Sequence, residues 1–217
     1  MKVVAFVPLK LNNERLPGKN TRTLDTGEPL FSKILQTLLG IDLIDETYVF
    51  CSSESIRDQL PEGVRFLRRS ESLDTPTTLS NDFVHAFAEE VEADIYILAF
   101  ATAPFTSEAS IRRMLSAVQS GESDSAMAVV RLQEFFWENG APSNFDLRAI
   151  PRTQDLNPVY METTGLYVFL RALAVDGGRR VGDNPLPVEV SKIEAIDINE
   201  PDDFVIANAV NTYLGKP

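Results

Sequence analysis

Positively charged residues gather in one short segment of an otherwise acidic chain. Residues 8–20 read PLKLNNERLPGKN and carry Lys10, Arg15 and Lys19. The chain has 217 residues and a formal net charge of -12, yet residues 1–23 hold five Lys or Arg against a single acidic residue. Cationic side chains and the backbone N–H groups of an irregular loop are suited to binding a polyphosphate. The segment therefore predicts a local anion site, and an ordinary solvated loop is the plainer alternative.

The position of this segment supports an anion site. It directly follows the apolar run at 3–7, which predicts a first strand. In open parallel sheets, ligands bind beyond the carboxyl ends of the strands, and the first strand-to-helix connection is a common phosphate site. The segment has neither the GxGxxG spacing of dinucleotide-binding folds nor the GxxxxGK[ST] spacing of P-loop proteins. We therefore expect a phosphate site of another kind.

A candidate metal ligand lies near the carboxyl end of the chain. Asp197 belongs to the strand-like run IEAIDI at 193–198, and a carboxylate at the carboxyl edge of a sheet is a suitable ligand for Mg²⁺. Asn199, Pro201 and Asp202 fit the start of a helix, as an N-cap, a first-turn proline and an acid favoured by the helix dipole. We expect Asp197 to bind the metal and Asn199 to be foremost a cap that could assist it. An ordinary surface aspartate is the alternative for Asp197.

Composition limits the class of protein. The hydrophobic fraction of 44% and the charged fraction of 24% are typical of a soluble globular protein, and no apolar run approaches the roughly 20 residues that a membrane span needs. The single cysteine, Cys51, excludes an internal disulfide and fits a reducing cytoplasm. One cysteine and one histidine make a structural zinc site or a cysteine–histidine nucleophile improbable. The acidity argues against binding to nucleic acid or to an anionic membrane.

Short apolar runs alternate with amphipathic segments along most of the chain. This alternation predicts an α/β fold with a mainly parallel sheet covered by helices on both faces, in one domain over 1–217. The predicted strands are 3–7, 47–52, 64–67, 94–100, 125–132 and 164–171, with strand-like runs at 187–191 and 193–198, and the predicted helices are 30–40, 54–60, 79–91, 107–121 and 200–214.

The regular alternation stops from 133 to 160. This stretch mixes prolines and turn residues with the large aromatic residues Phe135, Phe136 and Trp137. Large aromatics exposed together usually mark an interface, whereas packing against their own domain is the alternative. We expect an excursion from the core that serves association of the chain.

Four stretches of the sequence form an ordered series. They are FVPLKLNNERLPGKN, with Pro8, Lys10, Arg15, Leu16, Pro17, Lys19 and Asn20; LRRSESLDTPTTLSNDFVHAF at 67–87, with Arg68, Asp74, Thr75 and Thr78; LAFATAPFTSEASI, with Thr102 and Pro104; and AIDINEPDDFVIANAV. The series resembles the motifs of the cytidylyltransferases that make CMP-activated acidic sugars, the family of CMP-N-acylneuraminate synthetase and CMP-3-deoxy-octulosonate synthetase. The resemblance covers essentially the whole chain.

The resemblance implies a fold, a reaction and an assembly. The fold is a three-layer, Rossmann-like nucleotidyltransferase fold, and the reaction transfers CMP from CTP to the anomeric hydroxyl of an acidic 2-keto sugar with release of pyrophosphate. The resemblance also implies Mg²⁺ as cofactor and a homodimer in which the excursion at about 133–160 helps to complete the partner's sugar site.

The resemblance further implies the site residues. The implied catalytic residues that grip the phosphates are Lys10, Arg15 and Lys19. The implied nucleotide-binding residues are Leu9, Lys10, Asn12, Lys19, Asn20, Arg68 and Thr78; the implied sugar contacts are Phe100, Thr102, Arg152, Tyr160 and Thr163; and the implied metal ligands are Asp197 and Asn199.

The chain departs from the family pattern at three places. Phe100 and Ala101 replace the glutamine and proline of sialic acid synthetases, TTGLY at 163–167 replaces Asn-Gly-Ala-Ile-Tyr, and Asn199 replaces the second aspartate of an Asp-x-Asp pair. These departures point to a different sugar or to reduced activity. The alternatives are a nucleotidyltransferase that acts on a sugar phosphate, phosphonate or alcohol phosphate, and a nucleotide-binding relative without catalytic activity.

Overall fold

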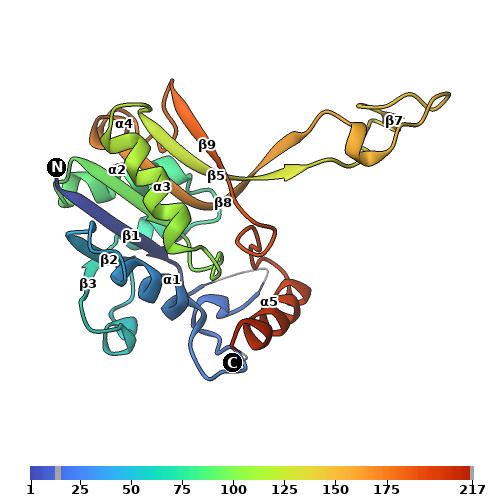
Figure 1. Cartoon of the computed structure of the whole chain (residues 1–217). Coiled ribbons are helices and arrows are strands. Elements are labelled where there is room, and N and C mark those ends of the chain that lie inside the picture. Colours follow the sequence, from blue (N-terminus) through green and yellow to red (C-terminus); the bar gives the residue numbers. More distant parts are fainter. Residues whose placement is uncertain (13–15, 216–217) are drawn as a thin grey trace.

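The computed structural model describes residues 1–12 and 16–215 and shows a three-layer α/β body with a projecting arm (Figure 1). Its strands are β1 Val3–Leu9, β2 Glu46–Cys51, β3 Val64–Arg68, β4 Ile95–Ala99, β5 Ser125–Leu132, β6 Trp137–Glu138, β7 Ala141–Pro142, β8 Val159–Leu170 and β9 Pro185–Glu189. Its α-helices are α1 Leu30–Leu39, α2 Ser80–Glu90, α3 Glu108–Gln119, α4 Arg171–Val175 and α5 Pro201–Leu214. Short 3-10 helices cover Lys19–Thr21, Glu54–Gln59, Glu71–Asp74 and Thr153–Asp155.

Seven of the described strands form one sheet in the order β3-β2-β1-β4-β8-β5-β9. The strand β8 runs antiparallel to its neighbours β4 and β5, and the other pairs are parallel. Both faces are covered, because alternate side chains of β1 enter two separate cores. Leu9 packs on the side of α1 and α3, whereas Phe6 lies on the side of α2 and α4, where its ring stacks on Phe87 with centroids 4.0 Å apart. The predicted fold class, a mainly parallel sheet between two helical layers, is confirmed.

The run at 193–198 was expected to be a strand, and that prediction is wrong. Residues 192–195 form a turn in which Glu194 accepts hydrogen bonds from the hydroxyls of Ser107 and Ser110 at 2.6 and 2.7 Å. The chain then runs extended, and the Ile198 N–H donates to the carbonyl of Thr102 at 2.9 Å. These contacts hold the segment against the loop after β4. Its apolar residues are therefore explained by packing at this place and not by formation of a strand.

The helix α5 closes the carboxyl edge of the sheet. Its Phe204 and Ala207 pack with Leu16, Leu24 and Leu30 from the segment that follows β1. The N-cap of the helix is Glu200, so the expectation that Asn199 is the cap is wrong. The physical reason is that the N3 carboxylate, Asp203, accepts the N–H groups of residues 199 and 200, each at 2.8 Å, which leaves the Asn199 side chain turned elsewhere.

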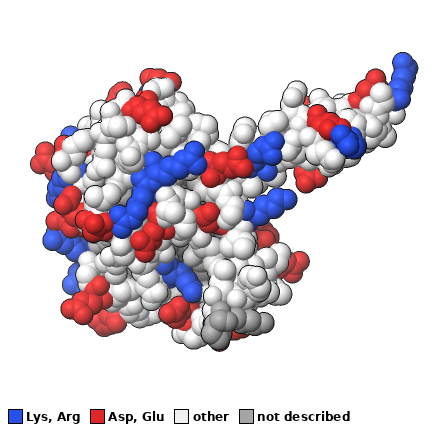
Figure 2. All heavy atoms as spheres, in the orientation of Figure 1, with Lys and Arg blue, Asp and Glu red and all other residues white. Residues whose placement is uncertain are grey.

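The arm consists of residues 133–158 together with the adjoining parts of β5 and β8 (Figure 1). Within it the ring of Phe145 contacts those of Phe135 and Trp137, with centroids 4.7 and 5.7 Å apart. Asn144 ties the same turn together, because its side chain accepts from the Phe136 N–H at 2.8 Å and donates to the Glu134 carbonyl at 2.9 Å. The arm is thus an ordered ribbon with its own contacts. Figure 2 shows basic and acidic side chains interspersed along it and over this face of the body.

No helix within the described part of the chain combines the length and the apolar character that crossing a membrane requires.

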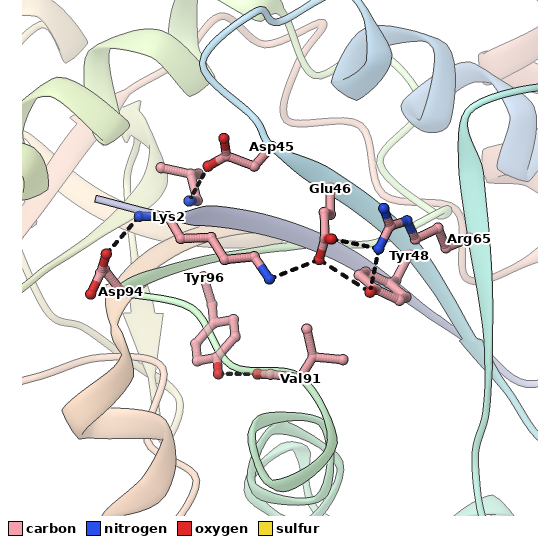
Figure 3. A network of polar contacts seen from close by, with 9 residues as sticks. Lys2, Asp45, Glu46, Tyr48, Arg65, Val91, Asp94 and Tyr96 are labelled. Atoms are coloured by element: carbon pink, nitrogen blue, oxygen red, sulfur yellow. Dashed lines mark hydrogen bonds and ion pairs between the residues drawn. The ribbon is translucent and has the colours of Figure 1, made fainter.

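A polar network holds the amino edge of the sheet, opposite the edge where ligands are expected (Figure 3). Glu46 forms ion pairs with Lys2 at 3.0 Å and Arg65 at 2.5 Å, and it accepts a hydrogen bond from Tyr48 at 3.1 Å. These contacts, the hydrogen bond from Lys2 foremost, lower the pKa of Glu46 below its usual value. Because the folded pKa is lowered, the contribution of Glu46 to stability is present above the unfolded pKa. It is lost as pH falls through the folded pKa.

We therefore expect Glu46→Gln to lower the melting temperature at neutral pH by about 2 °C to 4 °C, and the difference from the parent to shrink between about pH 5 and pH 3. Thermal melts across this range measure the effect. Glu62→Gln, at an exposed position, is the matched control. A difference that stays constant with pH would contradict the role given to Glu46.

Candidate active site

A cavity of about 410 Å³ opens at the carboxyl edge of the sheet. Its walls are formed by the segments that follow β1, β3 and β4, by β8 and the loop after α4, and by the chain just before α2 and α5. Segments far apart in the sequence meet here because parallel strands direct their carboxyl ends to one edge. The cavity therefore lies where the sequence predicted an anion site.

The described residues that line this cavity carry mostly positive charge. Among the described lining residues, the basic ones are Lys10, Lys19, Arg69 and Arg180, and the only acidic one is Asp197. Four cations against one carboxylate give a positive site in a chain whose net charge is -12. A concave site lined by one sign of charge attracts ligands of the other sign.

Lys19 is held next to the segment before α5. Its ammonium donates to the Ile198 carbonyl at 3.0 Å and lies 3.4 Å from Oδ1 of Asn199. The amide of Asn199 in turn donates to Asp197 at 2.6 Å. By contrast, the ammonium of Lys10 has no hydrogen bond or ion pair to any described side chain, although it lines the same cavity. The lysines thus differ: one is positioned by the protein and the other is open to a ligand.

Two buried side chains that line the cavity keep polar atoms without a partner among the described residues. Arg69 is only 4% exposed; it donates to the Leu9 carbonyl at 3.1 Å and pairs with Asp74, but its Nε is unpaired. Asn20 is 6% exposed; its amide donates to the Lys10 carbonyl at 2.9 Å, but its Oδ1 is unpaired. An unsatisfied buried polar group costs about 1–3 kcal/mol. Because both atoms are themselves buried, a ligand would pair with them only if its binding shifted these side chains.

Thr164 has a strained backbone beside Asp197. Its φ is 56°, which is unusual for a β-branched residue and typically costs about 1–3 kcal/mol. The strain arises where the pairing of β5 with β8 shifts register between Met127 and Val129. The irregularity turns Thr164 to the cavity, with its hydroxyl 3.4 Å from Asp197. The next residue, Gly165, has no room for a side chain, since a Cβ would lie 2.5 Å from Cβ of Ala103.

Most residues that the sequence singled out lie at this cavity. Those that line it are Lys10, Lys19, Asn20, Thr78, Phe100, Thr102, Asp197 and Asn199. Arg15 lies outside the described residues. The pattern of strand ends thus brings the central residues of the prediction together.

Three predicted nucleotide-binding residues do not line the cavity. Leu9 is fully buried beneath it and offers only its carbonyl to Arg69, and Asn12 is exposed outside it. Arg68, at the end of β3, has a side chain that is 64% exposed and lies 3.8 Å from Glu54. The neighbouring arginine, Arg69, occupies the wall instead.

The predicted sugar contacts are more scattered. Thr163 is buried, and its hydroxyl donates to the Ala128 carbonyl at 3.2 Å, so that the next residue, Thr164, faces the cavity. Arg152 and Tyr160 are exposed on or next to the arm and do not line the cavity of their own chain. The sequence reasoning missed Arg69, Thr164 and Arg180. The Arg-Arg and Thr-Thr pairs can be recognised in the sequence, but the sequence does not show which residue of each pair faces the cavity.

The donors at the cavity fit a metal ion that arrives with its ligand. No three His, Cys, Asp or Glu side chains among the described residues form a cluster that could hold a metal by themselves. Asp197 supplies one carboxylate, while Asn199 directs its NH₂ to that carboxylate and its oxygen to Lys19. Mg²⁺ is often bound by one or two carboxylates together with substrate phosphates. The residues present therefore fit Mg²⁺ carried by a polyphosphate.

The single cysteine is not suited to act as a nucleophile. Cys51 lies at the end of β2 and is fully buried, and this burial raises the pKa of its thiol. A reactive cysteine needs a lowered pKa and access to its substrate. Cys51 is therefore a core residue. The side chains that line the cavity are instead suited to binding and polarising an anionic ligand.

Comparisons with curated proteins find relatives of this chain. The chain is 27% identical to CMP-N,N'-diacetyllegionaminic acid synthase of Legionella pneumophila over 225 residues, which cover 95% of this chain and 94% of that protein. It is 24% identical to 3-deoxy-manno-octulosonate cytidylyltransferase of Christiangramia forsetii over 115 residues, which cover 52% of this chain and 44% of that protein.

Solved structures show the same fold at low sequence identity. CMP-2-keto-3-deoxy-manno-octonic acid synthetase complexed with CTP matches with a TM-score of 0.74 and 14% identity, over 99% of this chain and all of that one. 4-Diphosphocytidyl-2C-methyl-D-erythritol synthase of Anaerococcus prevotii matches with a TM-score of 0.67 and 13% identity, over 97% of this chain and 96% of that one. The model of the family described as "Cytidylyltransferase" matches residues 4–181. The chain therefore belongs to the cytidylyltransferase family.

Proposed function

We propose that the protein transfers CMP from CTP to the anomeric hydroxyl of an acidic 2-keto sugar and releases pyrophosphate. The observation that carries this proposal is the positive cavity at the carboxyl edge of the sheet in a chain of the cytidylyltransferase family. The relative that matches along almost its full length is a CMP-legionaminic acid synthase, which supports an acidic sugar as acceptor.

The reaction asks the protein mainly to position and to stabilise charge. The anomeric oxygen forms a bond to the α-phosphorus as the bond from that phosphorus to pyrophosphate breaks, and the hydroxyl proton is released. Lys10 and Lys19 line the cavity and bind the phosphate oxygens whose negative charge grows as pyrophosphate leaves. Lys19 is already held in position before the ligand binds, because the Ile198 carbonyl and Asn199 accept hydrogen bonds from its ammonium.

The nucleoside end of CTP binds on the side of α2. Arg69 and Asn20 offer one unpaired buried donor and one unpaired buried acceptor, and Thr78 lines the cavity near them. Cytosine and ribose both carry donors and acceptors, so they can satisfy groups that the protein leaves without partners. Such groups give selectivity because a ligand without the matching atoms leaves them buried and unpaired.

Asp197 and Asn199 line the cavity where they would hold Mg²⁺ that arrives with the nucleotide. When bound, it screens the repulsion between the triphosphate and a carboxylate and polarises the reacting phosphate. Asp197 would provide the carboxylate for it, and Asn199 would add an amide at the same edge. Thr164 and Asn199 orient Asp197 through contacts of 3.4 and 2.6 Å.

The active assembly is a homodimer formed through the arm. The arm and its base expose large apolar side chains, with Trp137 58%, Leu147 55%, Ile150 62% and Tyr160 51% exposed. A two-stranded ribbon is marginally stable alone, and exposed apolar patches favour a partner. Arg152 and Tyr160 do not line the cavity of their own chain, which supports their contact with the sugar bound by the partner subunit.

Two observations support a different acceptor as a second candidate. Phe100 lines the cavity, where sialic acid synthetases carry glutamine, and the fold is shared with an enzyme named for an erythritol substrate. A phosphorylated alcohol is therefore the second candidate for the acceptor.

The buried Cys51 fits a cytoplasmic location, where the thiol stays reduced.

Purified protein with CTP, Mg²⁺ and a panel of 2-keto sugar acids should release pyrophosphate, with CTP preferred over other nucleoside triphosphates. Lys10→Met should lower kcat/KM by about 100-fold or more, because a cation that binds growing phosphate charge is lost. Lys192→Met is the matched control, since Lys192 is exposed and does not line the cavity. Pyrophosphate release with phosphorylated alcohols alone would identify the second acceptor. A CTP-induced rise in melting temperature without turnover of any acceptor would indicate a binding protein.

Asp197→Asn should leave the melting temperature of the unliganded protein nearly unchanged and lower kcat by about 100-fold or more at saturating Mg²⁺. The same variant should abolish the part of the CTP-induced thermal shift that depends on Mg²⁺. Asp202→Asn, at an exposed position in the first turn of α5, is the control. Turnover within about twofold of the parent would show that Asp197 is not the metal ligand.

Light scattering should give about twice the chain mass of 24.1 kDa. Trp137→Ser should shift the protein toward the monomer, because the loss of a large aromatic removes apolar area from the arm. Val205→Ser, which changes a side chain on α5 that is 68% exposed, should not. A parent protein that stays monomeric at micromolar concentration would refute the dimer.

A further inference from the structure

Arg180 is a second guanidinium group at the cavity, and the reaction as described above gives it no role. It lies in the loop after α4, lines the cavity and has a side chain that is 24% exposed. Its neighbour Arg179 pairs with Asp183 at 2.6 Å and does not line the cavity. The two adjacent arginines therefore differ in surroundings, and only one of them faces the cavity.

The guanidinium of Arg180 is supported by Tyr167 and only loosely paired with Glu162. It lies 4.1 Å from the ring centroid of Tyr167, a cation–π contact that holds its plane. Its Nη2 is 3.5 Å from Oε1 of Glu162, at the outer limit of a hydrogen bond. The same oxygen accepts the hydroxyl of Tyr167, and burial foremost raises the pKa of Tyr167, so that this donor stays protonated. The guanidinium group of Arg180 thus keeps N–H donors that can bind a ligand.

The backbone that carries Arg180 is fixed against α2. Gly177 and Gly178 both have positive φ, of 82° and 68°, and the carbonyl of Gly177 accepts from the Asn81 side chain at 3.1 Å. At Gly178, a Cβ would lie 1.9 Å from the Asn81 carbonyl oxygen, so only glycine permits this approach. The position of Arg180 is therefore built into the fold.

The two guanidinium groups of the cavity stand on either side of β4. Arg69 donates to Leu9 at the end of β1, and Arg180 lies over Tyr167 of β8. Neighbouring strands are spaced by about 4.8 Å, so β1 and β8, which these two arginines contact, lie about 10 Å apart across the sheet. One phosphate group is too small to bridge them. The cavity therefore has cationic forks for two separate groups, with Lys10 and Lys19 as further cations for phosphate.

We propose that Arg180 binds the carboxylate of the acidic sugar and selects for it. This inference rests on the proposed function and names the side chain that recognises the acid. A planar fork matches a carboxylate with two parallel hydrogen bonds, and stacking on Tyr167 sets its orientation in advance. The position beside β8 places it on the side of the cavity from which the arm departs, away from the Arg69 side.

The test compares the sugar acid that turns over fastest with its carboxamide, which keeps the shape and removes the charge. The parent should prefer the acid by about 10- to 100-fold in kcat/KM, and Arg180→Met should abolish that preference through a raised KM for the acid. Arg179→Met should keep the preference. Arg180→Lys, which retains the charge without the fork, should give an intermediate value.

For each variant, the melting temperature without CTP reports folding, and the rise in melting temperature on addition of CTP reports nucleotide binding. This shift should be unchanged in Arg180→Met; its loss would assign Arg180 to the nucleotide and overturn the inference. Turnover with an undiminished preference for the acid in Arg180→Met would overturn the inference alone. Absence of pyrophosphate with every acid in the parent would overturn the proposed function, and the inference with it.

Discussion

A small apolar cluster joins the two ends of the chain, and the active-site edge depends on it. Leu16, Leu24 and Leu30 follow β1, and they pack with Ile198 and Phe204 at the start of α5. All five are at most 9% exposed. Full burial of one such side chain contributes about 1.5–3 kcal/mol, whereas an exposed ion pair contributes about 0–1 kcal/mol. Apolar burial therefore holds the segment with Lys10 and Lys19 against the segment with Asp197.

The amide at position 199 changes the charge of that edge. It accepts from Lys19 and donates to Asp197, so it links a cation to an anion without adding charge of its own. An aspartate at the same place would pair with Lys19 and weaken the attraction of that cation for phosphate. Asn199 thus favours a more positive cavity at the expense of a stronger metal site. In the proposed reaction, the same choice would leave the protein dependent on the nucleotide to bring Mg²⁺.

The sequence predicted the body of the fold well because strands that are buried on both faces appear as short apolar runs between amphipathic helices. It failed where the outcome depended on contacts from elsewhere in the chain. The alternation of β3 turns Arg68 to solvent and leaves Arg69 for the cavity. The register shift against β5 buries Thr163 and exposes Thr164. Arg180 faces the cavity only because its loop rests on α2, and no local pattern encodes that contact.

The strand β8 runs without interruption from the arm into the centre of the sheet. Tyr160 lies at its outer part and Tyr167 beneath Arg180, and seven residues of strand span about 23 Å. Between them, the same strand carries the strained Thr164. The same strand thus carries a side chain of the arm and a side chain that supports the cavity wall, with the register shift between them. The arm and the cavity wall therefore share one continuous strand, and the register shift lies at their junction.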